Sequence, residues 1–207
     1  MNHLIKNIQR LQHSPIQQTV QQRIQDFKNI NRFSAEDLFK ELCFCILTAN
    51  FNAERTMHIH SHLKDCFCSE SKEVIAQQLK AHGYRFPNTR AAHITESRLY
   101  KNQLPLIINT YGQNERRTWL ANNIKGFGQK ESSHFLRNIG FDDYAIIDSH
   151  ILDLLERNHL ITKPKTLTPT KYKEIETILH ELARQTNLTV AALDLYLWYL
   201  ETGKILK

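Results

Sequence analysis

The residues of this sequence that could carry out covalent chemistry stand around a short glycine hairpin, KGFG at 125–128. Lys130 follows the hairpin in the first turn of a predicted helix, where the helix dipole disfavours a cation. An amine attacks carbon only in its neutral form, so a lysine that is destabilised as a cation could act as a nucleophile. From these residues alone, a solvated lysine that contacts phosphate is the simpler interpretation.

Asp148 is the second candidate, because it follows the apolar run 144–147 and precedes the helical pattern HILDLLE. A carboxylate in this position is commonly an N-cap that accepts a hydrogen bond from the first helical turn. It can also be a proton acceptor held at the mouth of a helix, and one side chain can do both. The chain that returns from the hairpin helix could bring Asp148 back to Lys130.

The hairpin itself has the composition of a phosphate site. Gly126 and Gly128 permit a tight turn and let another backbone come close, while N–H groups at the following helix start point outward. Lys125 is suited to contact phosphate, and Phe127 can pack between the flanking helices. Plain turns between two helices also use glycine, so the hairpin alone does not decide between structure and binding.

Helical patterns cover most of the chain and predict the elements that position these residues. Ser34 with Asp37 resembles a capping box, Thr168 precedes a proline, and Thr189 can cap a last helix. Apolar residues recur at helical spacing over residues 16–29, 53–64, 71–81, 89–103, 113–122, 129–139 and 149–159. No long run alternates with period two, so we predict an all-α fold of about ten helices.

Two breaks in these patterns suggest two helical domains. The segment 161–171 contains two prolines, and a second break lies near Phe33-Ser34. The predicted central domain contains a helix-hairpin-helix at about 113–139. The predicted domain ranges are 34–160 for the central domain and 1–33 plus 161–207 for a second domain formed by both termini.

Composition sets the broad class of the protein. The 207 residues carry a formal charge of +6, which tolerates a polyanionic partner without requiring one. No stretch approaches 18 consecutive apolar residues and no signal peptide is evident, so we expect no membrane partner and a cytoplasmic location. The four cysteines form two C-F-C pairs at 43–45 and 66–68. They are interpreted as intracellular thiols rather than as a metal site.

The stretch IKGFGQK, with an aspartate and a histidine at 148–150, resembles the helix-hairpin-helix DNA glycosylase superfamily in its bifunctional glycosylase/AP lyase branch. Four segments that span nearly the whole chain are similar to the archaeal-type (type-two) 8-oxoguanine DNA glycosylase/AP lyases. They are LCFCILTANFNAE, GYRFPNTRA, HFLRNIGFDDYAIIDSHIL and LDLYLWYLETGKILK. Ile146-Ile147 stand where the superfamily often has proline-valine. Ser149 stands where relatives have arginine, a difference that concerns one phosphate contact.

The resemblance implies an all-α fold of two domains with duplex DNA in the cleft between them. Lys130 would attack the sugar of 8-oxoguanosine and cleave the strand through a Schiff base by β-elimination, with Asp148 as acid and base. The expected partner is double-stranded DNA that contains 8-oxoguanine, bound by a nucleoid-associated monomer. An oxidised-pyrimidine glycosylase/lyase and a non-catalytic DNA-binding module are the alternatives. No cofactor and no iron–sulfur cluster are expected, since a C-terminal cysteine cluster is missing. A monovalent cation at the hairpin is compatible with the resemblance.

The resemblance also suggests residues for the base and for the DNA backbone. Phe86 and Trp198 would stack the oxidised base, Asp194 shares a helix face with Trp198, and the final residue Lys207 would reach into the pocket. Trp198 as a core residue and Lys207 as a disordered chain end are the structural alternatives. The remaining DNA-binding candidates are Asn50, Phe51 and Asn52 as a wedge, Asn50 alternatively as a helix C-cap, and Lys125, Gly126, Gly128 and His150.

Overall fold

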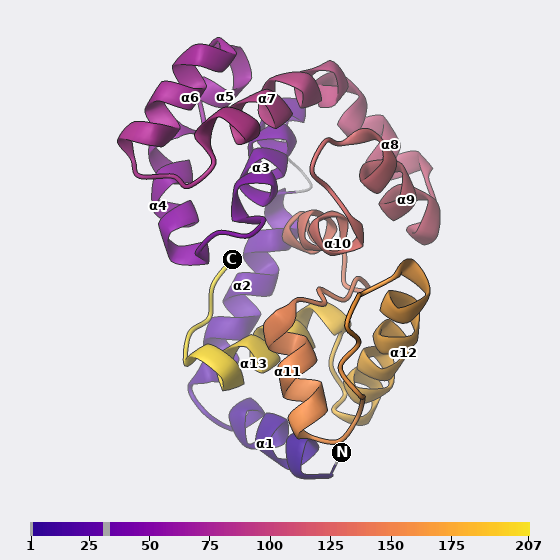
Figure 1. The fold of residues 1–207 in the computed structure, drawn as a ribbon. Coiled ribbons are helices and arrows are strands. Elements are labelled where there is room, and N and C mark those ends of the chain that lie inside the picture. Colours follow the sequence, from indigo (N-terminus) through magenta and orange to yellow (C-terminus); the bar gives the residue numbers. More distant parts are fainter. Residues whose placement is uncertain (1, 31–33) are drawn as a thin grey trace.

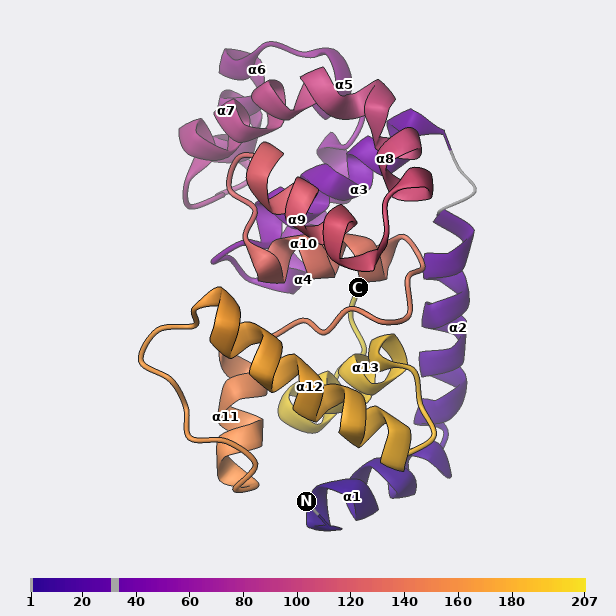
Figure 2. The ribbon, with the colours of Figure 1, turned by 90° about the vertical axis from the view of Figure 1, so that its right-hand side faces the viewer.

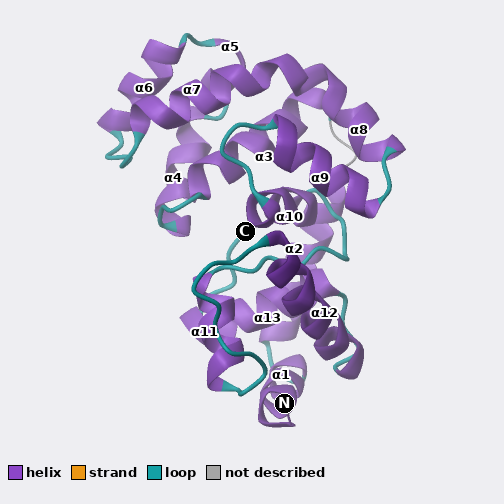
Figure 3. Cartoon of the chain, turned by 45° about the vertical axis from the view of Figure 1, so that its right-hand side comes forward, coloured by secondary structure: helices purple, strands orange, loops and turns teal. Residues whose placement is uncertain are grey.

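The computed structural model describes residues 2–30 and 34–207, and the regular elements of these residues are helices without any strand (Figures 1 and 3). The predicted all-α class is confirmed. The helices are α1 (Asn2–Gln12), α2 (Ile16–Ile30), α3 (Ala35–Thr48), α4 (Ala53–Leu63), α5 (Cys66–Ser69), α6 (Lys72–Ala81), α7 (Pro87–Ser97), the 3-10 helix η1 (Arg98–Gln103), α8 (Leu104–Thr110), α9 (Gln113–Asn123), α10 (Gln129–Asn138), α11 (Ser149–Arg157), α12 (Pro169–Gln185) and α13 (Val190–Thr202).

The helix starts follow the capping residues of the sequence. Ser34 and Asp37 form the predicted capping box at α3, with hydrogen bonds of 3.2 Å in both directions. Thr168 caps α12 ahead of a proline at its first position, and Thr189 caps α13. These short-range bonds satisfy N–H groups that the helix leaves free. The predicted break at Phe33 lies outside the described residues.

Two hydrophobic cores divide the molecule, and the helices that contribute to them form an upper and a lower part in Figure 1. The central core takes its buried residues from α3 to α10 and ends at Tyr144. The terminal core combines α1, α2, α11, α12 and α13 and begins again at Ala145. This division differs from the predicted boundary at residue 160, because Ile151 and Leu155 of α11 are buried in the terminal core. Of the predicted linker 161–171, residues 161–168 are a loop between α11 and α12, and Pro169 already starts α12.

Helix α2 runs along the side of the terminal core and reaches the central core at its end (Figure 2). Phe27 is buried in the terminal core, whereas Ile30 packs against the central core. Arg137 of α10 lies over the Phe27 ring at 4.6 Å, so α2 also contacts the helix after the hairpin. No helix of residues 2–30 and 34–207 is long and apolar enough to span a membrane.

Candidate active site

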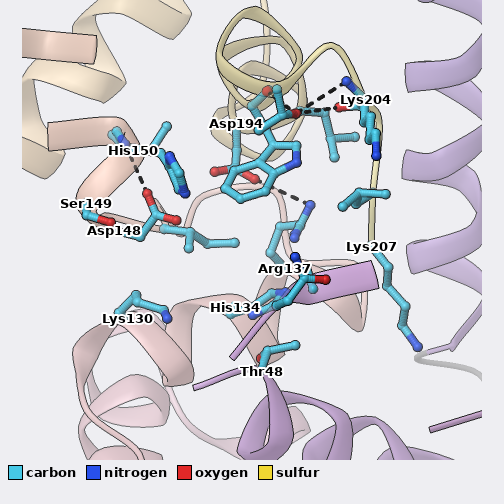
Figure 4. Close-up of a pocket in the computed structure, with 18 of the residues that line it drawn as sticks. Thr48, Lys130, His134, Arg137, Asp148, Ser149, His150, Asp194, Lys204 and Lys207 are labelled. Carbon is cyan, nitrogen blue, oxygen red and sulfur yellow. Dashed lines mark hydrogen bonds and ion pairs between the residues drawn. The ribbon is translucent and has the colours of Figure 1, made fainter. Parts of the chain in front are cut away.

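A cleft of about 770 Å³ lies between the two cores (Figure 4). Its walls come from the end of α3, the start of α10, the start of α11, the face of α13 and the last residues of the chain. Lys130 and Asp148 both line it, as do Asn50, Phe51, Asn52, His150, Asp194, Trp198 and Lys207. The structure therefore brings nine of the residues singled out from the sequence into one cavity.

Lys130 stands in the first turn of α10, where free N–H groups make a cation unfavourable. Its side chain is 28% exposed, and its Nζ lies 3.2 Å from Glu131 Oε1. Glu131 also accepts the N–H of Gly128 at 3.2 Å, so this carboxylate closes the helix start and pairs with the lysine. Figure 4 shows Lys130 at the edge of the cleft, on the side where Asp148 lies. The amine is accessible to a ligand in the cavity.

Asp148 is the N-cap of α11, as one of the two sequence interpretations had it. Its Oδ1 accepts the N–H of Ile151 at 3.0 Å, and its residue is half-buried. Its Oδ2 makes no hydrogen bond with any residue that the structure describes. One oxygen thus holds the side chain in place while the other remains available to a ligand or a proton.

Asp194 forms a charged wall of the cleft with Arg137. Arg137 Nη1 lies 3.4 Å from Asp194 Oδ2, and the two side chains are 4% and 13% exposed. Burial raises the pKa of Asp194 to about 6 against the opposing effect of Arg137, and the negative charge of Asp148 adds to the rise. The carboxyl group of Asp194 therefore gains a proton in the mildly acidic range.

Trp198 is half-buried and lies one turn beyond Asp194 on the cleft face of α13. Its indole N–H is buried without a hydrogen-bond partner among the described residues. The ring of His150, at the start of α11, meets it edge-on with centroids 5.1 Å apart. Trp198 is therefore a cleft residue rather than the fully buried core residue that was the structural alternative.

Lys207 is held in the cleft by an ion pair with a buried carboxylate. The ammonium group of Lys207 pairs with Glu41 of α3, a carboxylate only 4% exposed, and lies 4.6 Å from the centre of the Phe44 ring. Asn138 donates a second hydrogen bond to Glu41 at 2.7 Å. The structure places the last residues between the two halves of the molecule (Figure 1), and the role of Lys207 in the pocket stays a prediction.

The predicted wedge residues each have a structural role as well as a place in the cleft wall. Asn50 has a left-handed backbone with φ of 59°, directly after the C-cap of α3. Asn52 caps α4 by accepting the N–H of Arg55 at 3.0 Å. Phe51 packs on Tyr84 with ring centroids 4.4 Å apart. These contacts set the shape of the turn, and its role as a wedge stays a prediction.

Phe86 and the hairpin lie outside the cleft lining. Phe86 precedes α7, is 39% exposed and carries Arg85 over its ring at 4.9 Å. In this conformation the structure does not bring Phe86 opposite Trp198 across the cavity, so their predicted sandwich stays a prediction. Lys125, Gly126 and Gly128 are exposed on the hairpin, whereas Phe127 is buried in the central core as expected.

His134 and Arg137 line the cleft and Glu41 holds Lys207, although the sequence did not single out these three residues. His134 and Arg137 follow Lys130 at helical spacing on α10, and that period could have found them. Burial lowers the pKa of His134 well below its usual value, so this ring is neutral at physiological pH. Glu41 had no such signal, since it interrupts an apolar helix far from Lys207 in the chain.

The four cysteines are free thiols. Cys43 and Cys45 are buried in the central core, and burial raises the pKa of both. Cys66 and Cys68 are half-buried at α5. In residues 2–30 and 34–207, no three histidine, cysteine, aspartate or glutamate side chains are grouped in a way that could hold a metal ion.

Comparison with known proteins identifies the family. The family described as 8-oxoguanine DNA glycosylase matches residues 20–188. The 8-oxoguanine DNA glycosylase/AP lyase of Methanocaldococcus jannaschii is 47% identical over 205 residues and covers 99% of both chains. Its counterpart in Korarchaeum cryptofilum is 45% identical over 207 residues, which are 99% of this chain and 98% of the relative. The crystal structure of the Methanocaldococcus jannaschii enzyme in complex with 15mer DNA containing 8-oxoguanine is 47% identical and superposes with a TM-score of 0.96, covering 99% of this chain and 100% of that one. The chain therefore belongs to the 8-oxoguanine DNA glycosylase family of helix-hairpin-helix proteins.

Proposed function

We propose that this protein excises 8-oxoguanine from duplex DNA and then cleaves the abasic strand by β-elimination. The observation that carries the proposal is the cleft in which Lys130 and Asp148 lie together. Its volume is in the range of sites that enclose a small ligand, so it suits a nucleoside turned out of the helix. Relatives with the same name and nearly the same length support this activity for the chain.

The proposed nucleophile is the amine of Lys130. Its nitrogen forms a bond with C1′ of the damaged nucleotide while the bond from C1′ to the base breaks and the base leaves with a proton. Opening of the sugar then gives an imine between the same nitrogen and C1′. The imine draws electrons when a proton leaves C2′, and the bond from C3′ to the phosphate oxygen breaks. The ion pair with Glu131 must open first, which costs little because this pair is partly exposed.

Asp148 is the proposed proton acceptor and electrostatic partner. Its free Oδ2 can take the proton of the attacking amine, and its negative charge stabilises the cationic sugar in the transition state. The hydrogen bond from Ile151 keeps the carboxylate oriented. Because an amine and a carboxylate supply this chemistry, the proposed reaction requires no cofactor.

The proposed base pocket is the inner part of the cleft. Trp198 offers an aromatic face, and Asp194 and the chain-end carboxylate of Lys207 can accept N–H groups of the base edge. Arg137 contributes a buried Nε–H that has no acceptor among the described residues, and the neutral ring of His134 also lines this wall. Unpaired buried donors favour a ligand with carbonyl oxygens, and 8-oxoguanine has two.

The proposed backbone contact is the exposed hairpin at 125–128. The N–H groups of Phe127 and Gly128 already bond Ile124 and Glu131, so the proposed phosphate donors are the Lys125 side chain and the remaining N–H groups of the hairpin and the first turn of α10. Phosphate contacts hold DNA without reading its sequence. Since the substrate is DNA, we also propose an intracellular location at the nucleoid.

The test is a panel of duplexes that carry 8-oxoguanine, an oxidised pyrimidine, an abasic site or no damage. We expect strand cleavage at 8-oxoguanine and at the abasic site. Preferential cleavage at the pyrimidine lesion would instead indicate an oxidised-pyrimidine enzyme. Binding without any cleavage would instead indicate a DNA-binding module without catalytic activity.

Substitution of the hairpin glycines is expected to weaken binding to damaged and undamaged duplex alike. Gly126 has φ of +84°, and a Cβ there would lie 2.5 Å from His93 Nδ1, so Gly126→Ala also strains the turn. Gly128 has ordinary extended backbone, and a Cβ there meets nothing closer than 3.5 Å. Gly128→Ala should therefore keep the melting temperature, and any loss of affinity for duplex DNA should come from its added methyl group facing a phosphate.

The measurement is the dissociation constant of each variant for both duplexes, together with thermal unfolding. Gly112→Ala serves as the matched control, since Gly112 is likewise an N-cap with a Cβ contact of 3.5 Å but lies away from the hairpin. A loss of affinity confined to lesion DNA would contradict the phosphate role.

Displacement of the chain-end carboxylate is expected to lower discrimination between 8-oxoguanine and guanine. The oxidised base has an N7–H donor where guanine has an acceptor, and a mispaired buried group costs about 1–3 kcal/mol. Added residues after Lys207 move the carboxylate but can keep the ammonium group on Glu41. Deletion of Lys207 also removes the counter-charge of the buried Glu41, which keeps only its hydrogen bond from Asn138, so it should lower stability by up to about 3–5 kcal/mol.

Single-turnover excision of 8-oxoguanine is compared for the full chain, the extended chain and the chain without Lys207. The extended chain is the cleaner variant because it separates the carboxylate from the ion pair. Equal excision rates in all three would place base recognition elsewhere in the cleft.

A further inference from the structure

The segment that leads to Asp148 crosses between the two cores without regular secondary structure. Tyr144 is buried in the central core, whereas Ala145 and Ile147 are buried in the terminal core. None of these residues belongs to a helix, and α11 starts only after Asp148. The place of the carboxylate in the cleft therefore depends on what holds the backbone of 145–147.

The hydroxyl group of Tyr172, on α12, holds two backbone groups of this segment. Its oxygen lies 2.6 Å from the carbonyl oxygen of Ala145 and 3.3 Å from the nitrogen of Ile147. Burial raises the pKa of Tyr172, so the phenol keeps its proton. It donates to the Ala145 carbonyl and accepts the Ile147 N–H. Since Tyr172 is only 2% exposed, water does not compete for these bonds.

Glu176, one turn further along α12, fixes the same segment to the other core. Its Oε1 accepts the N–H of Ala145 at 3.3 Å. Its two oxygens accept Nη1 and Nη2 of Arg117 at 2.5 and 2.8 Å. Arg117 stands on α9, before the hairpin, so this bidentate pair joins the two halves of the molecule with fixed geometry.

The network also reaches the helix that carries Lys130. Ser133 lies one turn after Lys130 on α10 and is fully buried. Its Oγ is 3.3 Å from the Tyr172 hydroxyl oxygen and 3.4 Å from Arg117 Nη1. The Tyr172 hydroxyl group thus connects α10, the helix that carries Lys130, with the segment 145–147 that leads to Asp148.

We propose that Tyr172 is a positioning residue for the reaction, which holds Asp148 at its working distance from Lys130 through Ser133 and the backbone of residues 145–147. Tyr172 does not line the cleft and acts only through these neighbours. The inference rests on the proposed function. It assigns the alignment of Lys130 and Asp148 to Tyr172, which is itself neither the nucleophile nor the proton acceptor. Displacement of a catalytic group by about 1 Å can lower a rate about 10²-fold.

Tyr172→Phe tests this inference because it removes the hydroxyl group and keeps the ring. We expect single-turnover excision of 8-oxoguanine to fall at least about tenfold, while the dissociation constant for the lesion duplex changes less than about twofold. Tyr84→Phe is the matched control. Tyr84 is also buried and donates to a backbone carbonyl, that of Leu47, at 2.6 Å, but it lies in the central core away from this network. The phenylalanine retains the ring on which Phe51 packs, so the shape of that turn is kept. Its excision rate should stay near that of the unchanged chain.

Amide hydrogen exchange supplies a readout that is independent of activity. The N–H of Ile147 should be protected in the unchanged chain and should exchange faster in Tyr172→Phe but not in Tyr84→Phe. Unchanged exchange, an excision rate within twofold of the unchanged chain, or an equal loss in Tyr84→Phe would each overturn the inference. An unchanged chain that does not cut 8-oxoguanine would refute the proposed function instead, and the exchange data would still decide whether the hydroxyl group holds the segment.

Discussion

Lys130→Gln is expected to abolish covalent trapping of the protein on 8-oxoguanine DNA by borohydride. Borohydride reduces the imine between an amine and the sugar to a stable bond, and glutamine has no amine with which to form it. Strand cleavage at the lesion should fall by at least about 10³-fold, in line with the loss of a nucleophile in other enzymes. Trapping on a denaturing gel and single-turnover cleavage measure the two effects.

The surroundings of Lys130 should allow Lys130→Gln to remove the amine with little effect on stability. Lys130 is partly exposed and pairs only with its neighbour Glu131, so its removal should change the free energy of unfolding by about 1 kcal/mol or less. Lys125→Gln is the matched control, because Lys125 is an exposed lysine on the same hairpin outside the cleft. It should reduce DNA affinity and keep trapping. Equal trapping by Lys130→Gln and the unchanged chain would disprove the assignment of the nucleophile.

Much of the fold can be predicted from the sequence because the deciding interactions are local. A capping residue and its bond partner lie within one turn, as at Ser34 and Asp37, and an apolar helix face repeats every three or four residues. The helices at 16–29, 113–122 and 129–139 were predicted within about two residues of their observed ends. The left-handed turn at Gly126 is predictable for the same reason, because two glycines between two helical patterns already indicate a tight turn.

The division into two cores cannot be predicted from local sequence, because it depends on contacts between residues that are remote in the chain. Two prolines marked 161–171 as a linker, but Ile151 and Leu155 before it pack against helices after it. Local sequence shows that α11 has an apolar face and does not show which core covers that face. The ion pair of Glu41 with Lys207 is hidden for the same reason. The returning chain was expected to bring Asp148 back to Lys130, and both residues do line one cleft; their catalytic roles came from the resemblance and stay a proposal.

Asp148→Asn is expected to bind lesion DNA normally and to excise 8-oxoguanine about 10²- to 10⁴-fold more slowly, the usual contribution of a general acid or base. Asparagine keeps an oxygen that can accept the N–H of Ile151, and it caps helices about as well as aspartate. The variant therefore removes the charge and the proton acceptor but retains the cap. Asp148→Ala removes both and should cost a further 1 kcal/mol or so of stability.

The two variants together separate chemistry from capping at Asp148. If Asp148 only caps α11, the asparagine variant keeps its excision rate and the alanine variant loses stability alone. Ser71→Ala is the matched control, because it removes the N-cap bond of α6 to Val74 on a helix remote from the cleft. It should lower the melting temperature and leave excision unchanged. A second readout is the pKa of Asp194, which the charge of Asp148 raises. Asp148→Asn should lower that pKa from about 6, and an unchanged value would show that the two carboxylates do not act on one another across the cleft.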